Sequence, residues 1–427
     1  MKNRRNFLKS FGTLAALPLL PLNGNSLNET SKLLDREIGE QALKASYSND
    51  FWGWVQQSYS SSANFINLNN GGVSPQPIVV QEAFKRYNDI CNEAPSYYMW
   101  RLFKRDVLVV RETLANLAGV DLDEIAINRN TTEALDTIIN GLPLKKGDEI
   151  VMCKYDYPNM KSVWKMREKR NEIKLNWVTF PAPCEDDETM VKAYTDQFTS
   201  KTKLVHLTHL INWTGQIVPV KKIADIAHSK GIEVLVDGAH SFGHIEYKIP
   251  DLGCDYFGTS LHKWMCAPFG TGMIYVKKDK ISKLWPSFPG ENPESDSIVK
   301  FGNLGTHSVP AEMAIGNAIN FHNSIGAKRK QERLHELKAY WIEKVKDIEN
   351  VVIYTSLLPN YSGALATFGI KGKEGGKISS ALERKYNIHS SPVKIEEVNG
   401  VRITPHVYTR KNDLDRLVRA IKIMAQE

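Results

Sequence analysis

From about residue 78 onward, the hydrophobic positions follow two alternating patterns. Some stretches carry apolar residues at helical intervals, which is typical of amphipathic helices. Between them lie short apolar runs, which are typical of buried strands. Strands that alternate with helices predict an α/β fold, with a mostly parallel sheet between helices. The predicted strands are 124–128, 148–153, 173–180, 203–210, 232–237 and 271–276, and the predicted helices are 78–90, 102–120, 131–140, 159–170, 188–199 and 220–230.

The pattern changes after about residue 310. Two helical stretches, 310–324 and 327–348, are followed by the strand-like runs "VVIYT" and "ALATFGI", a helix over 376–386, the run "VRITP" and a last helix over 412–425. This mixture predicts a smaller α+β domain. The expected parts of the chain are 1–25, an export signal; 26–65, an N-terminal segment; 66–308, the large domain; and 309–427, the small domain.

Composition narrows the class of protein. The chain has 427 residues, of which 42% are hydrophobic and 24% charged, as in globular proteins with a large core. The net charge is +7, but no basic block is interleaved with aromatic residues, so nucleic acid is not an expected partner. The five cysteines include no CxxC pair, which disfavours a zinc site or a dense disulfide framework. We expect no metal site.

The first 25 residues differ from the rest of the chain. They open with basic residues and continue into an apolar run that is too short to cross a bilayer. The stretch "RRNFLK" resembles a twin-arginine export signal, although no clear A-x-A site marks a cleavage point. The alternative is a disordered basic N-terminus. The signal predicts the twin-arginine export machinery as a partner, a periplasmic or cell-envelope location, and no stable membrane span.

Polar residues follow two of the predicted strands at the positions where ligands bind in parallel sheets. Asp237 follows the run "IEVLV", and Thr131 and Thr132 open the helix after "EIAIN". The carboxyl ends of parallel strands form the ligand crevice of such a sheet. A helix start that carries hydroxyl groups also suits an anion. Taken singly, each of these residues has helix capping as its alternative role.

A lysine, Lys263, lies in the unusual stretch "TSLHKWMCAPFGTG". A neutral lysine amine can form a Schiff base with a carbonyl group, and burial lowers the pKa of a lysine enough to allow this. The alternative for a lone lysine is an exposed loop position. Together, however, Lys263, Asp237 and the hydroxyl groups at residues 131 and 132 match the needs of pyridoxal phosphate: a link to its aldehyde, a partner for its pyridine nitrogen and a cradle for its phosphate.

The segments "VDGAHSFGHI" and "CDYFGTSLHKW" resemble class V aminotransferase-fold enzymes, which are pyridoxal-phosphate dependent and of fold type I. The resemblance runs from about residue 65 to the end, and its nearest branch is the isopenicillin N epimerase-like proteins, beside the cysteine desulfurases. It implies a seven-stranded type of sheet and a small C-terminal domain. Its implied cofactor contacts are Lys263 as the covalent anchor, Asp237 at the pyridine nitrogen, Thr131, Thr132, Ser260 and His262 at the phosphate, Asn212 at the ring hydroxyl, Tyr157 as the stacking aromatic and His240 beside the ring.

The resemblance also implies contacts with the substrate and with a second subunit. Arg402 in "NGVRITP" matches an arginine that grips the substrate carboxylate, and Asn70 in "NLNNGGVSP" lies in a segment that lines the active site. Gly305 and Thr306 match a segment that reaches the phosphate of a neighbouring subunit, which implies a homodimer with shared active sites. At Tyr157 the chain departs from the many relatives that carry histidine. Packing or surface exposure is the alternative role of each of these residues.

The implied chemistry takes place at the α-carbon of an amino-acid substrate, as an aminotransferase or an epimerase. Lys263 is the expected base for the α-proton. A lyase or a desulfurase-like enzyme is the alternative, although "NIHSSPVKIEEVNG" has no cysteine where desulfurases carry their sulfur acceptor. An inactive binding protein of this fold is disfavoured because Lys263 and Asp237 are both present. A nucleotide-binding dehydrogenase is disfavoured because no GxGxxG follows the first strand.

Overall fold

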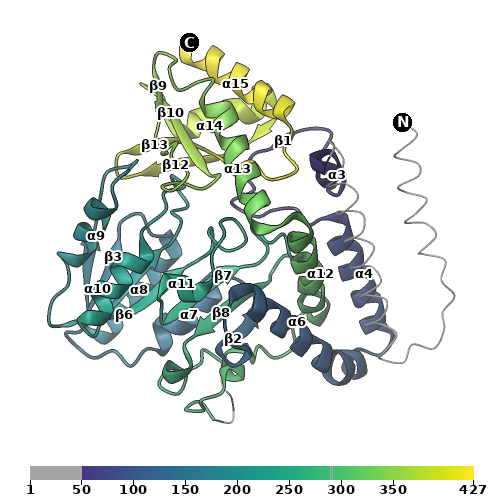
Figure 1. Ribbon diagram of the computed structural model, residues 1–427, viewed down its shortest axis with the longest axis vertical. Helices are drawn as coiled ribbons and strands as arrows, with labels where there is room; N and C mark the ends of the chain where they lie inside the picture. The colour runs from purple at the N-terminus through teal and green to yellow at the C-terminus, as the bar shows by residue number, and fades with distance from the viewer. Residues whose placement is uncertain (1–50, 289, 291) are drawn as a thin grey trace.

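The computed structural model describes residues 51–288, 290 and 292–427. The predicted export signal over 1–25, and most of the segment over 26–65, lie outside the described residues. Figure 1 shows a large domain around a central sheet and a smaller domain, formed by the C-terminal part of the chain, beside it. Within the described part of the chain, no helix combines the length and the hydropathy that a membrane span requires.

Seven strands form the central sheet: β2 (Ile125–Asn128), β3 (Glu149–Cys153), β4 (Lys174–Val178), β5 (Thr202–Thr208), β6 (Glu233–Asp237), β7 (Tyr256–Ser260) and β8 (Gly272–Val276). Their order across the sheet is β2-β8-β7-β6-β5-β3-β4. The strand pairs β4–β3, β3–β5, β5–β6 and β6–β7 are parallel, whereas β8 runs antiparallel to both of its neighbours, β2 and β7. The prediction of an α/β fold with a mostly parallel, seven-stranded sheet is therefore confirmed.

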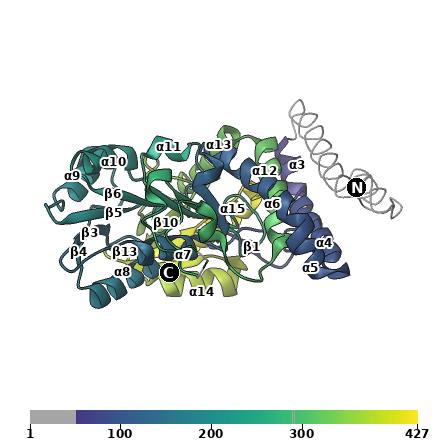
Figure 2. The same cartoon turned by 90° about the horizontal axis from the view of Figure 1, so that it is seen from below.

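Helices cover both faces of this sheet, so successive strand residues pack into two different cores. In β6, Val234 and Val236 join the core on one face, whereas Leu235 joins the core on the other. The first core is covered by α4 (Ile78–Glu93), α6 (Phe103–Ala118), α9 (Asp187–Thr195), α10 (Val220–Ser229) and α12 (Val309–Ile325), and the second by α7 (Thr131–Gly141) and α8 (Pro158–Asn171). Figure 2 shows α10 and α8 on opposite sides of the sheet.

The hydrophobic pattern misses one central strand, β7, which lies between β6 and β8 and leads directly to Lys263. Its five residues contain Gly258 and end in two hydroxyl residues, so no apolar run marks them. Gly258 has a packing reason: a Cβ atom there would lie 2.8 Å from Cδ2 of Leu135 on α7. The glycine therefore lets α7 pack close against the sheet.

A four-stranded antiparallel sheet, in the order β12-β13-β10-β9, forms the centre of the small domain. Its strands and helices are β9 (Val351–Ile353), β10 (Ala366–Ile370), β12 (Ser391–Ile395), β13 (Val398–Ile403), α13 (Ala327–Ile342), α14 (Gly375–Tyr386) and α15 (Lys411–Gln426). The predicted α+β character is confirmed. The hydrophobic pattern misses β12, because polar residues and a proline interrupt its sequence "SPVKI".

The N-terminal part of the described chain joins the two domains. After α3 (Phe51–Gln57), the short strand β1 (Ile66–Asn67) pairs in parallel with β11 (Ile388–His389) of the small domain. A turn of π-helix and the three-residue helix α5 (Pro95–Tyr97) connect α4 with α6. The predicted small domain begins at residue 309 with α12, but α12 packs against α4 and α6 of the large domain.

Candidate active site

A cavity of about 490 Å³ opens where the carboxyl ends of the central strands meet the small domain. Asp237 ends β6, Ser260 ends β7 and Thr131 begins the helix after β2, so the sheet topology brings them to one edge. The predicted residues that line the cavity are Thr131, Thr132, Tyr157, Asn212, Asp237, His240, Ser260, His262, Lys263 and Arg402. The predicted positions that do not line it are Asn70, Gly305 and Thr306.

The start of α7 provides a site for an anion. Asn130 caps this helix by accepting a hydrogen bond from the backbone N–H of Glu133, at 2.9 Å. Ser260 Oγ accepts a hydrogen bond from the backbone N–H of Thr131, at 2.9 Å, and lies 2.7 Å from Thr131 Oγ1. These contacts hold two hydroxyl groups at a helix N-terminus, where the helix dipole favours negative charge.

The carboxylate of Asp237 is buried at the end of β6, with 3% of the residue exposed. Its Oδ1 accepts a hydrogen bond from the backbone N–H of Ala239 at 2.9 Å. Burial raises the pKa of Asp237, while that N–H and the charge of Lys263 act in the opposite direction. A carboxylate in this state gains from a cationic partner, such as a protonated pyridine nitrogen.

The amine of Lys263 lies inside the cavity. Its Nζ is 3.2 Å from Nε2 of His240 and 6.0 Å from the centre of the Tyr157 ring. Burial lowers the pKa of Lys263 to about 8, and Arg402 adds to the effect, whereas Asp237 opposes it. A fraction of the amine is therefore neutral at physiological pH, as nucleophilic attack on a carbonyl requires.

The two predicted histidines face the cavity in the neutral form. Burial lowers the pKa of His262 to about 4, and its Nδ1 donates a hydrogen bond to the carbonyl oxygen of Thr271 at 3.0 Å. Its other nitrogen, Nε2, is then an acceptor. A bound phosphate would favour the protonated ring, because a nearby anion raises the pKa of histidine. Burial also keeps the pKa of His240 well below its usual range.

Arg402 reaches the cavity from β13. Its Nη1 donates to the carbonyl oxygen of Asn212 at 3.0 Å, and its Nη2 donates to Oδ1 of Asn69 at 2.8 Å. Its Nε is buried without a hydrogen-bond partner in the described chain, and so is Oδ1 of Asn212. Unpaired buried polar groups are costly, so both atoms indicate a ligand that completes them.

The prediction that Asn70 lines the active site is wrong by one residue. Asn70 does not line the cavity: its side-chain nitrogen donates to the carbonyl oxygen of Thr404 at 2.8 Å, and its Oδ1 accepts from the hydroxyl of Tyr408 at 2.6 Å. Asn69 lines the cavity instead and holds Arg402. The asparagine pair in "NLNNGG" could not be resolved from the sequence, because β1 is too short to fix which side chain faces inward.

Gly305 and Thr306 lie outside the cavity and are exposed. Gly305 has a φ of 68°, a left-handed conformation that glycine adopts without strain. Their expected role concerns a neighbouring subunit and stays a prediction. The lining residues that sequence reasoning did not name are Asn69, Gly71, Gly72, Asn130, Met160, Thr208, Trp213, Ala239 and Ser391. For Thr208, its place near the end of the predicted strand 203–210 is an available signal.

The residues of the cavity fit pyridoxal phosphate. The donor set offers a buried amine, a buried carboxylate and hydroxyl groups at a helix start, which are the partners of its aldehyde, pyridine nitrogen and phosphate. The unpaired Oδ1 of Asn212 adds an acceptor, and the unpaired Nε of Arg402 adds a donor. Within the described residues, no group of three or more His, Cys, Asp or Glu side chains could hold a metal ion.

Comparison with known proteins agrees with this donor set. Isopenicillin N epimerase of Amycolatopsis lactamdurans is 25% identical over 397 residues, which cover 88% of this chain and 99% of that protein. A probable cysteine desulfurase of Halalkalibacterium halodurans is 27% identical over 384 residues, covering 84% of this chain and 92% of that protein. Among solved structures, a cystine C–S lyase has the same fold, with a TM-score of 0.76, 22% identity and coverage of 84% and 98%.

The family comparison covers both domains. The aminotransferase class-V family matches residues 66–417, from β1 to the last helix, and this range contains every residue that lines the cavity. The range starts beyond the predicted export signal. The chain therefore belongs to the aminotransferase class-V family, and its cofactor is pyridoxal phosphate.

Proposed function

We propose that this class V enzyme acts at the α-carbon of an amino acid, as an aminotransferase or an epimerase. The observation that carries the proposal is the placement of Lys263, Asp237 and Arg402 around one cavity, with Arg402 Nε buried and unpaired. A buried guanidinium without a carboxylate partner in the described chain suits the carboxylate of an incoming amino acid. The 25% sequence identity with isopenicillin N epimerase of Amycolatopsis lactamdurans supports the epimerase alternative.

In this proposal, each side chain around the cavity has a separate role. Bound pyridoxal phosphate supplies an aldehyde and a protonated pyridine ring that withdraws electrons from the α-carbon. Asp237 stabilises that ring proton, and the hydroxyl groups at the start of α7 hold the phosphate. Arg402 orients the substrate carboxylate. Lys263 then lies in the same cavity as a base for the α-proton, and its pKa of about 8 suits proton transfer near neutral pH.

The cysteines argue against a desulfurase that uses a protein thiol. All five cysteines of the chain are buried, and none lines the cavity. Ser391, which pairs with Arg402 in the β12–β13 register, is the lining residue from the segment where desulfurases carry their sulfur-accepting cysteine. A lyase needs no such thiol, because it expels a substituent from the β-carbon. A lyase is therefore the second candidate function.

A panel of L- and D-amino acids separates these activities. The purified protein is incubated with each compound while the cofactor spectrum and the products are followed. A keto acid indicates transamination, the opposite enantiomer indicates epimerisation, and release of the β-substituent indicates a lyase. If no amino acid changes the cofactor spectrum, the proposal is wrong.

We also propose a homodimer in which Gly305 and Thr306 serve the neighbouring site. The support is that both residues are exposed and that neither lines the cavity of its own subunit. Mixing two inactive variants, Lys263→Ala and Thr306→Glu, tests this. A mixed dimer would regain one site with an intact lysine and an intact Thr306. No recovery after mixing and refolding would contradict a shared site.

Export through the twin-arginine pathway is the last part of the proposal. The support is the order of Arg4, Arg5 and the apolar run that follows, all ahead of the family match. Replacing both arginines by lysine should retain the protein in the cytoplasm of a twin-arginine-competent host. Cell fractionation and immunoblotting measure this. Equal export of both forms would contradict the signal.

A further inference from the structure

Trp264, the residue after Lys263, lies behind the cavity and contacts it through His240. The indole is fully buried, and its Nε1 lies 3.5 Å from Nδ1 of His240. Within the described residues, the indole N–H donates to this nitrogen. The other nitrogen of His240, Nε2, lies 3.2 Å from Nζ of Lys263. Trp264, His240 and Lys263 are therefore connected in that order by two contacts between nitrogen atoms.

The indole determines where the proton of His240 lies. An indole N–H can only donate, so Nδ1 of His240 must be the acceptor. Burial keeps the pKa of His240 well below its usual range, and Lys263, Arg402 and His244 act in the same direction. The ring is therefore neutral at physiological pH and carries its single proton on Nε2. That N–H points to Lys263.

This tautomer has a consequence for the lysine. An ammonium group offers only N–H donors, so it would face the N–H of His240 without an acceptor. A neutral amine has a lone pair that accepts this N–H. The opposite tautomer would satisfy an ammonium, but it would place two buried N–H groups, on Trp264 and His240, against each other. The three groups are all satisfied only when Lys263 is neutral.

The position of Trp264 is itself fixed. The ring of His244 stacks on the indole, with the ring centres 3.7 Å apart and the planes at 24°. His244 cannot rotate freely, because its Nδ1 donates to the carbonyl oxygen of His240 at 2.8 Å and its Nε2 accepts from the backbone N–H of Ala364 at 2.8 Å. His406 stacks at 5.7 Å from the indole. The indole N–H is therefore held in one direction.

We propose that Trp264, acting through His240, shifts the protonation equilibrium of Lys263 toward the neutral amine that captures the cofactor. In that capture, Nζ forms a double bond with the aldehyde carbon, and the aldehyde oxygen leaves as water with the two amine protons. Trp264 is a positioning residue, since it does not line the cavity and acts on the amine through His240. The proposal rests on the proposed role of Lys263 as the anchor.

The first test measures the tautomer directly. Full-length protein with ¹⁵N-labelled histidine rings is studied by NMR in the cofactor-free state, with the His240→Gln variant used to assign the His240 signals. We expect the proton on Nε2 of His240 at pH 7. A proton on Nδ1 would overturn the proposal. This measurement does not depend on activity, so it can fail while the proposed function holds.

The second test removes the indole N–H while keeping an aromatic ring. In Trp264→Phe, His240 is free to present an acceptor to Lys263, which favours the ammonium form. The rate of covalent pyridoxal phosphate capture, followed by absorbance in the cofactor-free enzyme, should shift its pH dependence upward by about one unit. At pH 7 this is a fall in rate of about tenfold.

A double-mutant comparison separates this effect from general damage. Glutamine at position 240 has an amide in place of the tautomeric ring, so adding Trp264→Phe to His240→Gln should cause no further shift of the pH profile. Charge effects of Asp237, Arg402 and His244 remain in all variants. An equal shift in both backgrounds, or an unshifted profile in folded Trp264→Phe, would overturn the proposal. If Trp264→Phe does not fold, the NMR result on the wild-type chain decides.

Discussion

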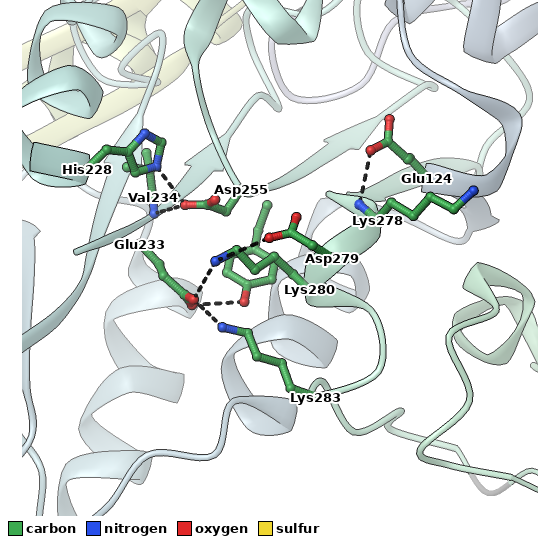
Figure 3. Close-up of polar contacts among 10 residues, drawn as sticks. Glu124, His228, Glu233, Val234, Asp255, Lys278, Asp279, Lys280 and Lys283 are labelled. Atoms are coloured by element: carbon green, nitrogen blue, oxygen red, sulfur yellow. Dashed lines mark hydrogen bonds and ion pairs between the residues drawn. The ribbon is translucent and has the colours of Figure 1, made fainter. Parts of the chain in front are cut away.

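The strand β6 carries an acidic residue at each end, and the two acids have opposite environments. At the amino end, Glu233 accepts hydrogen bonds from Tyr256 at 2.9 Å and Lys280 at 3.1 Å, and it also pairs with Lys283 (Figure 3). Burial acts to raise the pKa of Glu233, but Lys283 and Lys280 outweigh it and the pKa is lowered. At the carboxyl end, burial prevails and the pKa of Asp237 is raised.

The neighbouring groups repeat this contrast. Beside Glu233, Asp255 accepts hydrogen bonds from the backbone of Val234 and from Nε2 of His228, each at 2.9 Å, and Figure 3 shows both contacts. Beside Asp237, the cavity contains the unpaired atoms Asn212 Oδ1 and Arg402 Nε. At the amino end, the carboxylates of Glu233 and Asp255 have partners within the folded protein, and these contacts stabilise the sheet. At the carboxyl end, the two unpaired atoms gain partners only when a ligand binds, which is typical of sites that trade stability for function.

The largest expected effect is at Lys263. In Lys263→Ala, the absorbance band near ~410–430 nm of the lysine-linked cofactor should disappear, because no other amine lines the cavity in the described chain. Turnover should fall by about 10²–10⁴-fold, the usual range for loss of a general base. Lys280→Ala, at the amino end of the sheet, is the matched control and should keep the band. A band that survives in Lys263→Ala would refute the assignment.

The two acids of β6 provide the most direct comparison. Asp237→Asn should lower kcat/KM by about 10²–10³-fold, as expected for loss of one electrostatic partner of the reacting group. It should not lower stability, since it removes a buried charge. Glu233→Gln should keep kcat/KM within about twofold but lower the free energy of unfolding by about 1–3 kcal/mol, because Lys280 and Lys283 lose their anion. Steady-state kinetics and urea unfolding measure both; similar losses of activity would contradict the comparison.

Arg402→Lys should have an intermediate effect. Lysine keeps the charge but not the planar fork that binds a carboxylate and holds Asn69. Loss of one hydrogen bond to a charged group costs about 1.5–3 kcal/mol, which corresponds to a rise in KM of about 10- to 150-fold. A substrate amine without a carboxylate is the control, and its KM should change little. If both KM values rise together, Arg402 supports the cavity wall and does not bind the carboxylate.

The smallest expected effects concern stability against pH. Glu233 has a lowered pKa in the folded chain, so its stabilisation is present above its unfolded value of 4.5 and is lost as the pH falls through the folded value. Lys263 has a folded pKa of about 8 against an unfolded 10.5, so the unfolded chain binds more protons between these values and stability rises with pH there. Unfolding free energies of Glu233→Gln and of cofactor-free Lys263→Met, each compared with wild type, isolate the two effects. The absence of a pH dependence in either difference would contradict the assigned pKa shift.

The sequence predicted the site better than the strands that carry it. Asp237 could be predicted because it directly follows an apolar run, and Thr131 because it opens the helix after another run; the sheet topology then brings them together. β7 was missed although it delivers Lys263, because the glycine that lets α7 approach also interrupts the hydrophobic pattern. The local sequence pattern therefore identifies residues with a candidate chemical role. Tertiary packing, as at Gly258, decides which residues form the strand that carries them.

Residues contributed from far along the chain were the hardest to predict. The choice between Asn69 and Asn70 depends on Thr404 and Tyr408, which no local pattern connects with β1. The contact of Trp264 with His240 is likewise invisible in the sequence, because aromatic residues next to a lysine are ordinarily core residues. Only the folded geometry reveals the direction of a single N–H group.

The hydrogen bond between Arg402 and Asn69 joins residues that are 333 positions apart. At about 5–20 residues per second, a ribosome takes about 17–67 s to add the second partner after the first. For most of that time β1 has no β11 to pair with, and the cavity lacks the side chains of Ser391 and Arg402. The complete cavity can therefore form only after Arg402 has been added to the chain.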